Sequence, residues 1–230
     1  MENGYVRKYL SVSTISMLGS CETKVTEILF KPRPPTQAMK AGAAAHEKVA
    51  AALPKITKED IVKQIKAFKP LQVRELPVYD AKTKICGRID QLDMTGMMEN
   101  GRNTGIIIDD KYPSNPDFIH GLTLYYKLQL SSYAVALENS DTYGGICSAV
   151  GAKLRYLQKG TNALIKEYDI NRQRLEDCKA NVPIASKVAW VLYEKRRQPE
   201  HRRFDVESGN WTNCFCNPAT RVSAQRKLIS

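Results

Sequence analysis

The chain has 230 residues, of which 43% are hydrophobic and 26% are charged, and both shares are ordinary for a soluble globular protein with one sizeable core. No run of about 18 apolar residues is present and the start, MENGYVRKYL, lacks an apolar core, so we expect neither a transmembrane helix nor a signal peptide. The net charge of +11 favours a polyanionic partner such as nucleic acid, although a solvated basic surface or a lysine-rich thermophile composition would give the same charge.

The first part of the chain predicts helices. Capping serines and spaced apolar residues predict a helix over 11–29, which a proline-rich segment ends. The alanine-rich segment 38–53 has strong helix propensity, and acids in the turn after Thr57 mark the start of a third helix. We therefore expect an N-terminal helical region over residues 1–70.

The pattern then alternates between strands and helices. A helix with an apolar stripe is expected over 118–137, and another over 172–194, which Pro183 should kink or divide. The expected strands are 73–79, 84–94, 105–110, 148–157 and 163–170. This order predicts a mixed α/β core over 71–194, followed by a basic tail with little periodicity over 195–230.

The segment 105–112, GIIIDDKY, places two acids and a lysine directly after three isoleucines. Buried charge needs an ion pair or a metal to offset its desolvation. Because alternate residues of a strand face the same side, Asp109 and Lys111 should share one face while Asp110 points to the other. Asp90, on the preceding predicted strand, should lie beside Asp109.

Two further pairs fit the same chemistry. His46 follows Gly42 by four residues on a predicted helix, and Gln129 and Tyr133 lie one helical turn apart. Metal-dependent phosphodiester cleavage needs oxygen or imidazole ligands on one side of the phosphate and a cation beside them. Packing roles remain open for these residues, above all for Tyr133, which also fits the core stripe of its helix.

In this order, the motifs resemble those of the RecB-like branch of the PD-(D/E)XK nuclease superfamily. The matching motifs are Gly42-x-x-x-His46, Gly87-Arg-Ile-Asp90, Asp109-Asp-Lys111 and Gln129-x-x-x-Tyr133. The Ser-x-Ser opening at Ser11, followed by Cys21 and by cysteines near the other end, is similar to the CRISPR-associated Cas-four nucleases and their viral relatives. The resemblance implies a restriction-endonuclease-like fold: a mixed β-sheet flanked by helices, with an N-terminal helical addition.

The resemblance also implies a function and a site. The expected activity is that of a Mg²⁺- or Mn²⁺-dependent deoxyribonuclease on single-stranded DNA or DNA ends, exonucleolytic with some endonuclease activity. Lys111 would orient or activate the attacking water, and Gln129 and Tyr133 would hold Lys111 or the DNA backbone. Glu75 falls where an acid often opens the first strand. The implied metal ligands are His46, Asp90, Asp109 and the backbone carbonyl of Asp110.

The cysteines match the family less completely. Related nucleases hold an iron–sulfur cluster with one early and three late cysteines, whereas here Cys21 is followed only by the late pair Cys214 and Cys216. Four thiolates are the usual requirement, and Cys178 would supply the fourth only if its helix lay close. An iron–sulfur cluster, a zinc ion with one other ligand, and no bound metal all remain open.

A basic cluster follows the last predicted helix and either lines the path of a DNA strand or forms a solvated helix end. Its members are Lys195, Arg196, Arg197, Arg202 and Arg203. The alternative to an enzyme is a non-catalytic nucleic-acid-binding protein on the same fold, which would be expected to lack part of the ligand set. We expect a cytoplasmic protein, in the host cytoplasm if viral, with DNA, a second copy, or CRISPR integration or recombination proteins as partners.

Overall fold

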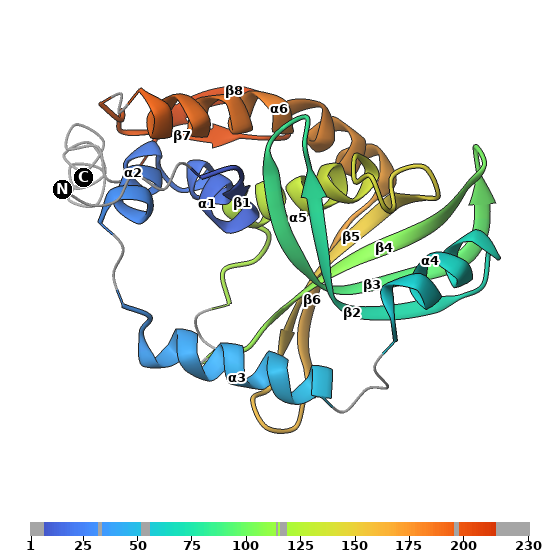
Figure 1. Cartoon of the computed structure of the whole chain (residues 1–230). Helices are drawn as coiled ribbons and strands as arrows, with labels where there is room; N and C mark the ends of the chain where they lie inside the picture. The colour runs from blue at the N-terminus through green and yellow to red at the C-terminus, as the bar shows by residue number, and fades with distance from the viewer. Residues whose placement is uncertain are drawn as a thin grey trace.

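The computed structural model describes residues 7–31, 34–51, 56–113, 115, 119–195 and 198–214 (Figure 1). Its helices are α1 (Val12–Ser16), the 3-10 turn η1 (Met17–Gly19), α2 (Glu22–Phe30), α3 (Gln37–Ala51), α4 (Lys58–Lys66), α5 (Leu124–Glu138) and α6 (Arg172–Glu194). Its strands are β1 (Leu10–Ser11), β2 (Leu71–Asp80), β3 (Ile85–Glu99), β4 (Arg102–Lys111), β5 (Cys147–Leu157), β6 (Leu164–Ile170), β7 (Arg202–Asp205) and β8 (Asn210–Asn213).

One mixed sheet forms the centre of the molecule. Its order is β1-β3-β4-β5-β6, and β2 pairs with β3 as well. The β2, β3 and β4 strands are antiparallel to their neighbours in turn, β4 and β5 are parallel, and β6 returns antiparallel to β5. The predicted mixed sheet flanked by helices is therefore confirmed, with strand ends within a few residues of those expected.

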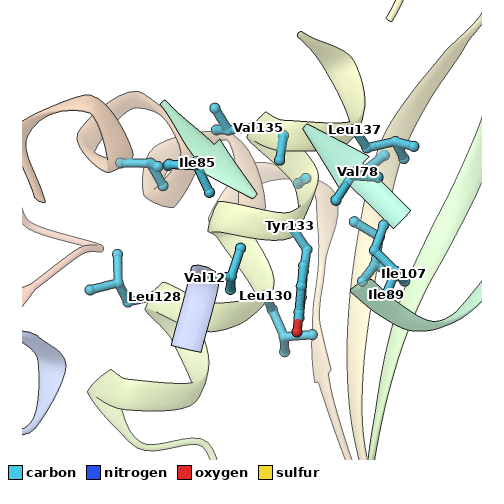
Figure 2. Packing of buried hydrophobic residues seen from close by; sticks show 14 of the residues in the cluster. Val12, Val78, Ile85, Ile89, Ile107, Leu128, Leu130, Tyr133, Val135 and Leu137 are labelled. Carbon is cyan, nitrogen blue, oxygen red and sulfur yellow. The ribbon is translucent and has the colours of Figure 1, made fainter. Parts of the chain in front are cut away.

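Helix α5 lies between the sheet and α6 (Figure 1). Every residue from Leu128 to Leu137 is buried, so α5 is covered on all sides rather than along one stripe. Figure 2 shows Leu130 and Tyr133 of this helix packed among core residues such as Ile89 and Ile107 of the sheet. The isoleucines that precede the acids in β4 thus anchor that strand under α5.

The N-terminal helix expected over 11–29 is wrong as a single element. Ser11 lies in β1 and caps α1, where its side chain accepts a hydrogen bond from the Thr14 amide at 3.1 Å. The chain then turns through η1 and restarts as α2. A Cβ on Gly19 would lie 2.6 Å from the backbone of Leu124, so the break allows close packing against the start of α5.

Two other expectations need correction. Helix α6 runs unbroken from Arg172 to Glu194, so Pro183 does not divide it, and this proline is exposed. The tail expected to lack periodicity contains the antiparallel hairpin of β7 and β8. Phe204 anchors the hairpin, because it is fully buried and its ring lies 5.0 Å from that of Trp211. Strands of four residues are too short to show a clear alternation.

Helix α3 contributes little to the core. None of its described side chains is buried, and in Figure 1 it lies on the far side of the molecule from α6. Its alanines give strong helix propensity without the large apolar side chains that would bury one face. Helix α3 is therefore a peripheral element, although it carries His46.

Candidate active site

The pairing of β3 with β4 brings two acids together. Gln91 lies opposite Ile108, so Asp90 and Asp109 are neighbours across the two strands. On the α5 side of β4, the Lys111 ammonium lies 2.5 Å from a carboxylate oxygen of Asp109. The Asp110 carboxylate instead contacts arginines on the opposite face. Strand alternation places these three residues as expected.

Glu75 enters the site through an unusual backbone conformation. Its φ is +54°, which for a residue other than glycine costs on the order of 1–3 kcal/mol and is often found at functional sites. On either side of it, Val73 and Leu76 are both buried, so the alternation of β2 breaks at this point. The Glu75 carboxylate lies 3.9 Å from His46 Nδ1.

His46 reaches the sheet from α3. Its Nδ1 lies 3.8 Å from an Asp90 carboxylate oxygen, and its ring meets the Tyr112 ring edge-on with centroids 5.2 Å apart. Burial, followed by the charge of Lys111, lowers the pKa of His46, while Glu75 and other nearby acids oppose this. The neutral imidazole favoured in this way is the form that binds a metal.

His46, Glu75 and Asp90 form a fitting donor set for a divalent cation. One ligand atom from each lies within 4.8 Å of the others. Burial, followed by the charge of Asp109, raises the pKa of Asp90 to about 8, although Lys111 and the Asp110 amide oppose the rise. A cation would offset this crowding of negative charge, and Mg²⁺ and Mn²⁺ both accept carboxylate oxygens.

The remaining predicted residues surround this group. Asp109 and Asp90 raise the pKa of Lys111 despite its burial, so its ammonium stays protonated. Burial, followed by Asp109 and Asp90, raises the pKa of Tyr133, and a side-chain hydrogen bond with Gln129 opposes that rise. Tyr133 is also a core residue (Figure 2), so its packing role and its position near the carboxylates coexist.

A cavity of about 620 Å³ lies in front of the donors. His46, Glu75, Asp90 and Tyr133 line it, together with serines near the start of the chain. Gly87 permits this arrangement, since a Cβ there would lie 2.7 Å from the Tyr133 ring. The donors are therefore reachable by a ligand larger than water.

A second group of donors joins the two ends of the chain. Cys21 Sγ lies 2.8 Å from Cys214 Sγ, and one ligand atom of His201 lies within 4.8 Å of both. The sequence interpretation missed His201, which was assigned only to a basic stretch; its place two strands before Cys214 in the hairpin was the missing signal. Cys178 is buried in α6 and is not part of this group.

The cluster implied by the family fits this second group poorly. The described residues supply two thiolates and an imidazole rather than four thiolates, and Cys216 lies outside the described ranges. Two sulfurs and one nitrogen suit a single tetrahedral ion better. Cys214 is disulfide-bonded, so it would ligate an ion only after that bond is reduced.

The basic cluster is divided in the structure. Arg202 pairs with the fully buried Glu22 at 2.8 Å and stacks on the Trp211 ring at 4.2 Å, so it holds β7 against α2. Arg203 donates a hydrogen bond to Thr212 and lines a separate cavity near the start of α5. Lys195 follows α6 and is exposed. Arg196 and Arg197 lie outside the described residues.

Within the described ranges, every helix is too short or too polar to cross a membrane.

Comparison with known proteins adds a family match. The model of the PD-(D/E)XK nuclease superfamily matches residues 13–214. No curated protein sequence matches the chain.

Similar solved structures share the fold at low sequence identity. A candidate exonuclease from Eubacterium rectale is 13% identical, with 96% of this chain and 91% of that chain covered and a TM-score of 0.52. The alkaline exonuclease LHK-Exo from Laribacter hongkongensis is 10% identical, with 83% and 90% covered and a TM-score of 0.49. The protein SSO0001 is 16% identical, with 86% and 82% covered and a TM-score of 0.41.

Proposed function

Because the chain belongs to the PD-(D/E)XK nuclease superfamily, we propose that it is a divalent-metal-dependent deoxyribonuclease that hydrolyses phosphodiester bonds. The observation that carries this proposal is the donor group His46, Glu75 and Asp90 at one cavity, beside the ion pair of Asp109 and Lys111. This set of hard donors and a buried cation suits phosphate chemistry.

His46, Glu75 and Asp90 would hold Mg²⁺ or Mn²⁺, with Asp109 and the Asp110 carbonyl as further proposed ligands. When bound, such an ion polarises a phosphoryl oxygen and lowers the pKa of bound water. Glu75 thus joins the ligands named from the sequence.

Lys111 acts as a cation rather than as a base in this proposal. Its raised pKa keeps it protonated, so it donates hydrogen bonds to the attacking water or to the phosphate and offsets the charge that develops there. Asp109 fixes the ammonium through their ion pair. Tyr133, held by Gln129, presents its hydroxyl near the same acids and would contact the DNA backbone.

We propose single-stranded DNA or DNA ends as the substrate, with exonucleolytic cleavage and some endonuclease activity. Support comes from the resemblance to RecB-like and Cas-four nucleases and from the net charge of +11. The biological setting we propose is CRISPR adaptation, or viral or cellular replication, recombination or repair. Integration or recombination proteins, or a second copy, are then the expected partners.

The test is a cleavage assay on end-labelled single- and double-stranded DNA with Mg²⁺, Mn²⁺ or EDTA. The unaltered chain should cut only with metal, and Asp109→Asn and Lys111→Ala should cut at least tenfold more slowly. Lys187→Ala, at an exposed lysine of α6, serves as the matched control and should cut normally. Metal-independent cutting, or normal cutting by both site variants, contradicts the proposal.

A protein that binds DNA without cutting it is the alternative. The complete donor set argues against it, because a carrier of DNA has no use for a crowded group of acids beside the phosphate path. Tight DNA binding with no cleavage under any metal condition would favour this alternative.

A further inference from the structure

The buried side of Asp110 is the feature that the proposed function leaves unused. Its carboxylate is fully buried on the sheet face opposite Asp109. Arg155 of β5 binds it with two donors, Nε at 2.8 Å and Nη2 at 3.0 Å, and Arg74 of β2 adds a third at 2.8 Å. One carboxylate thus joins arginines from strands on both sides of β3 and β4.

The arginines have few alternatives to this carboxylate. Arg155 also donates to the buried Gln91 at 2.9 Å, whereas Arg74 Nε is buried without a hydrogen-bond partner among the described residues. Buried ion pairs repay their desolvation only with good geometry and full hydrogen bonding. The incomplete pairing of Arg74 indicates that this cluster is retained for something other than stability.

The main chain of the same residue touches the donor group. The Asp110 amide donates a hydrogen bond to Asp90 Oδ2 at 2.9 Å, the oxygen that also faces His46. The Asp110 carbonyl is one of the proposed ligands. Any rotation of this peptide unit would therefore move Asp90 and the carbonyl together.

We propose that Asp110 is a positioning residue for the metal site, held by Arg155 and Arg74. The arginine clamp, defined as these three side chains, fixes the Asp110 peptide so that its amide orients Asp90 and its carbonyl points to the ion. This inference rests on the proposed function, whose metal site it deepens. Partners that orient metal ligands typically change affinity or activity by about 10- to 100-fold when lost.

The experiment compares Asp110→Asn and Arg155→Lys with the unaltered chain. Asparagine keeps the shape of the side chain but loses the charge, and lysine keeps the charge but loses the two-pronged contact. Both variants should weaken Mn²⁺ binding, measured by calorimetry without DNA, by about 10- to 100-fold. They should lower kcat similarly with little change in KM for DNA, because the clamp does not face the cavity.

The control is Lys153→Gln, which lies two residues before Arg155 on the same strand and pairs at 2.7 Å with Glu167 instead. It removes an ion pair from the same sheet face without touching Asp110, so Mn²⁺ affinity should not change. If Asp110→Asn does not fold, Arg155→Lys decides the matter. Mn²⁺ affinity within twofold of the unaltered chain in a folded variant would overturn the proposal.

A second measurement separates this inference from the nuclease proposal. Hydrogen exchange at the Asp110 amide should be slow in the unaltered chain and faster in Arg155→Lys, whether or not the protein cuts DNA. A fast-exchanging Asp110 amide in the unaltered chain also overturns the clamp. Absence of cleavage together with a protected amide would instead overturn only the nuclease activity.

Discussion

The two donor groups of this chain differ in both chemistry and construction. The first, His46 with Glu75 and Asp90, offers an imidazole and carboxylates at the cavity, and two of its members lie on paired strands of the sheet. The second, Cys21 with His201 and Cys214, offers sulfur and joins segments 193 residues apart. Carboxylates suit Mg²⁺ and Mn²⁺ whereas thiolates suit zinc or iron, so one chain presents separate sites for unlike metals.

The largest effect should come from the cation beside the first group. Replacing Lys111 with Met removes the only charge paired with Asp109 in the described part of the chain and should lower kcat on single-stranded DNA by about 10²- to 10³-fold. Single-turnover cleavage with Mg²⁺ measures this. Cys21→Ser is the comparison variant, and a similar loss there would mean that the two groups do not act separately.

The next effect concerns metal binding by the first group. Glu75→Gln keeps the size of the side chain but removes a charged donor, so Mn²⁺ affinity should fall at least about tenfold. Calorimetric titration of Mn²⁺ in EDTA-treated protein checks this. Arg88→Gln is the matched control, since Arg88 pairs with Glu75 at 2.9 Å but is largely exposed and contributes no ligand. Equal Mn²⁺ affinity in the unaltered chain and in Glu75→Gln would remove Glu75 from the site.

Zinc should reveal the second group. In reduced protein, Zn²⁺ at about 100 times its dissociation constant should raise the free energy of unfolding by about 2.7 kcal/mol. His201→Gln should lose most of that gain, whereas Glu75→Gln should keep it. Thermal unfolding with and without Zn²⁺, under reducing conditions, makes the comparison. A gain that is the same in both variants would place the zinc elsewhere.

The smallest effect concerns how the hairpin of the second group is attached. Glu207 pairs with Lys127 of α5 at 2.5 Å and Arg174 of α6 at 2.7 Å, and these hydrogen bonds lower its pKa from 4.5 to about 2. Its contribution is therefore complete above about pH 4.5 and is lost as the pH falls toward 2.

Because Glu207 is partly exposed, that contribution should not exceed about 1 kcal/mol. Glu207→Gln should be less stable than the unaltered chain at pH 6, and the difference should shrink between pH 4.5 and pH 2. Urea unfolding at several pH values measures it. Glu176→Gln, which removes an exposed partner of Lys179, is the control and should give no such pH dependence.

The first group was largely predictable because strand alternation acts locally. Asp90, Asp109 and Lys111 follow from the period of two residues and the pairing of adjacent strands. Glu75 could be noted but not placed, since its position depends on a left-handed backbone that breaks the alternation of β2. Likewise, the pattern over 11–29 could not show that close packing on α5 would divide the helix at Gly19.

The second group could not be assembled from the sequence. Cys21 and Cys214 stood out as possible partners, but His201 lies in a hairpin whose short strands depend on burial of Phe204 under the helices. The arginine clamp was equally hidden. Arg74 and Arg155 belong to strands that alternation alone does not connect to Asp110, and only the sheet order brings them to one face.

The peripheral packing of α3 has a consequence for how the first ligand is held. No described side chain of α3 is buried, so the fold itself stabilises the position of His46 only weakly. Part of the free energy of ion binding must then be used to dock this helix, and the measured affinity reports the helix equilibrium as well as the coordination bonds. The ion would act as a fastener for the N-terminal part of the chain, and hydrogen exchange in α3 should slow when Mn²⁺ is added.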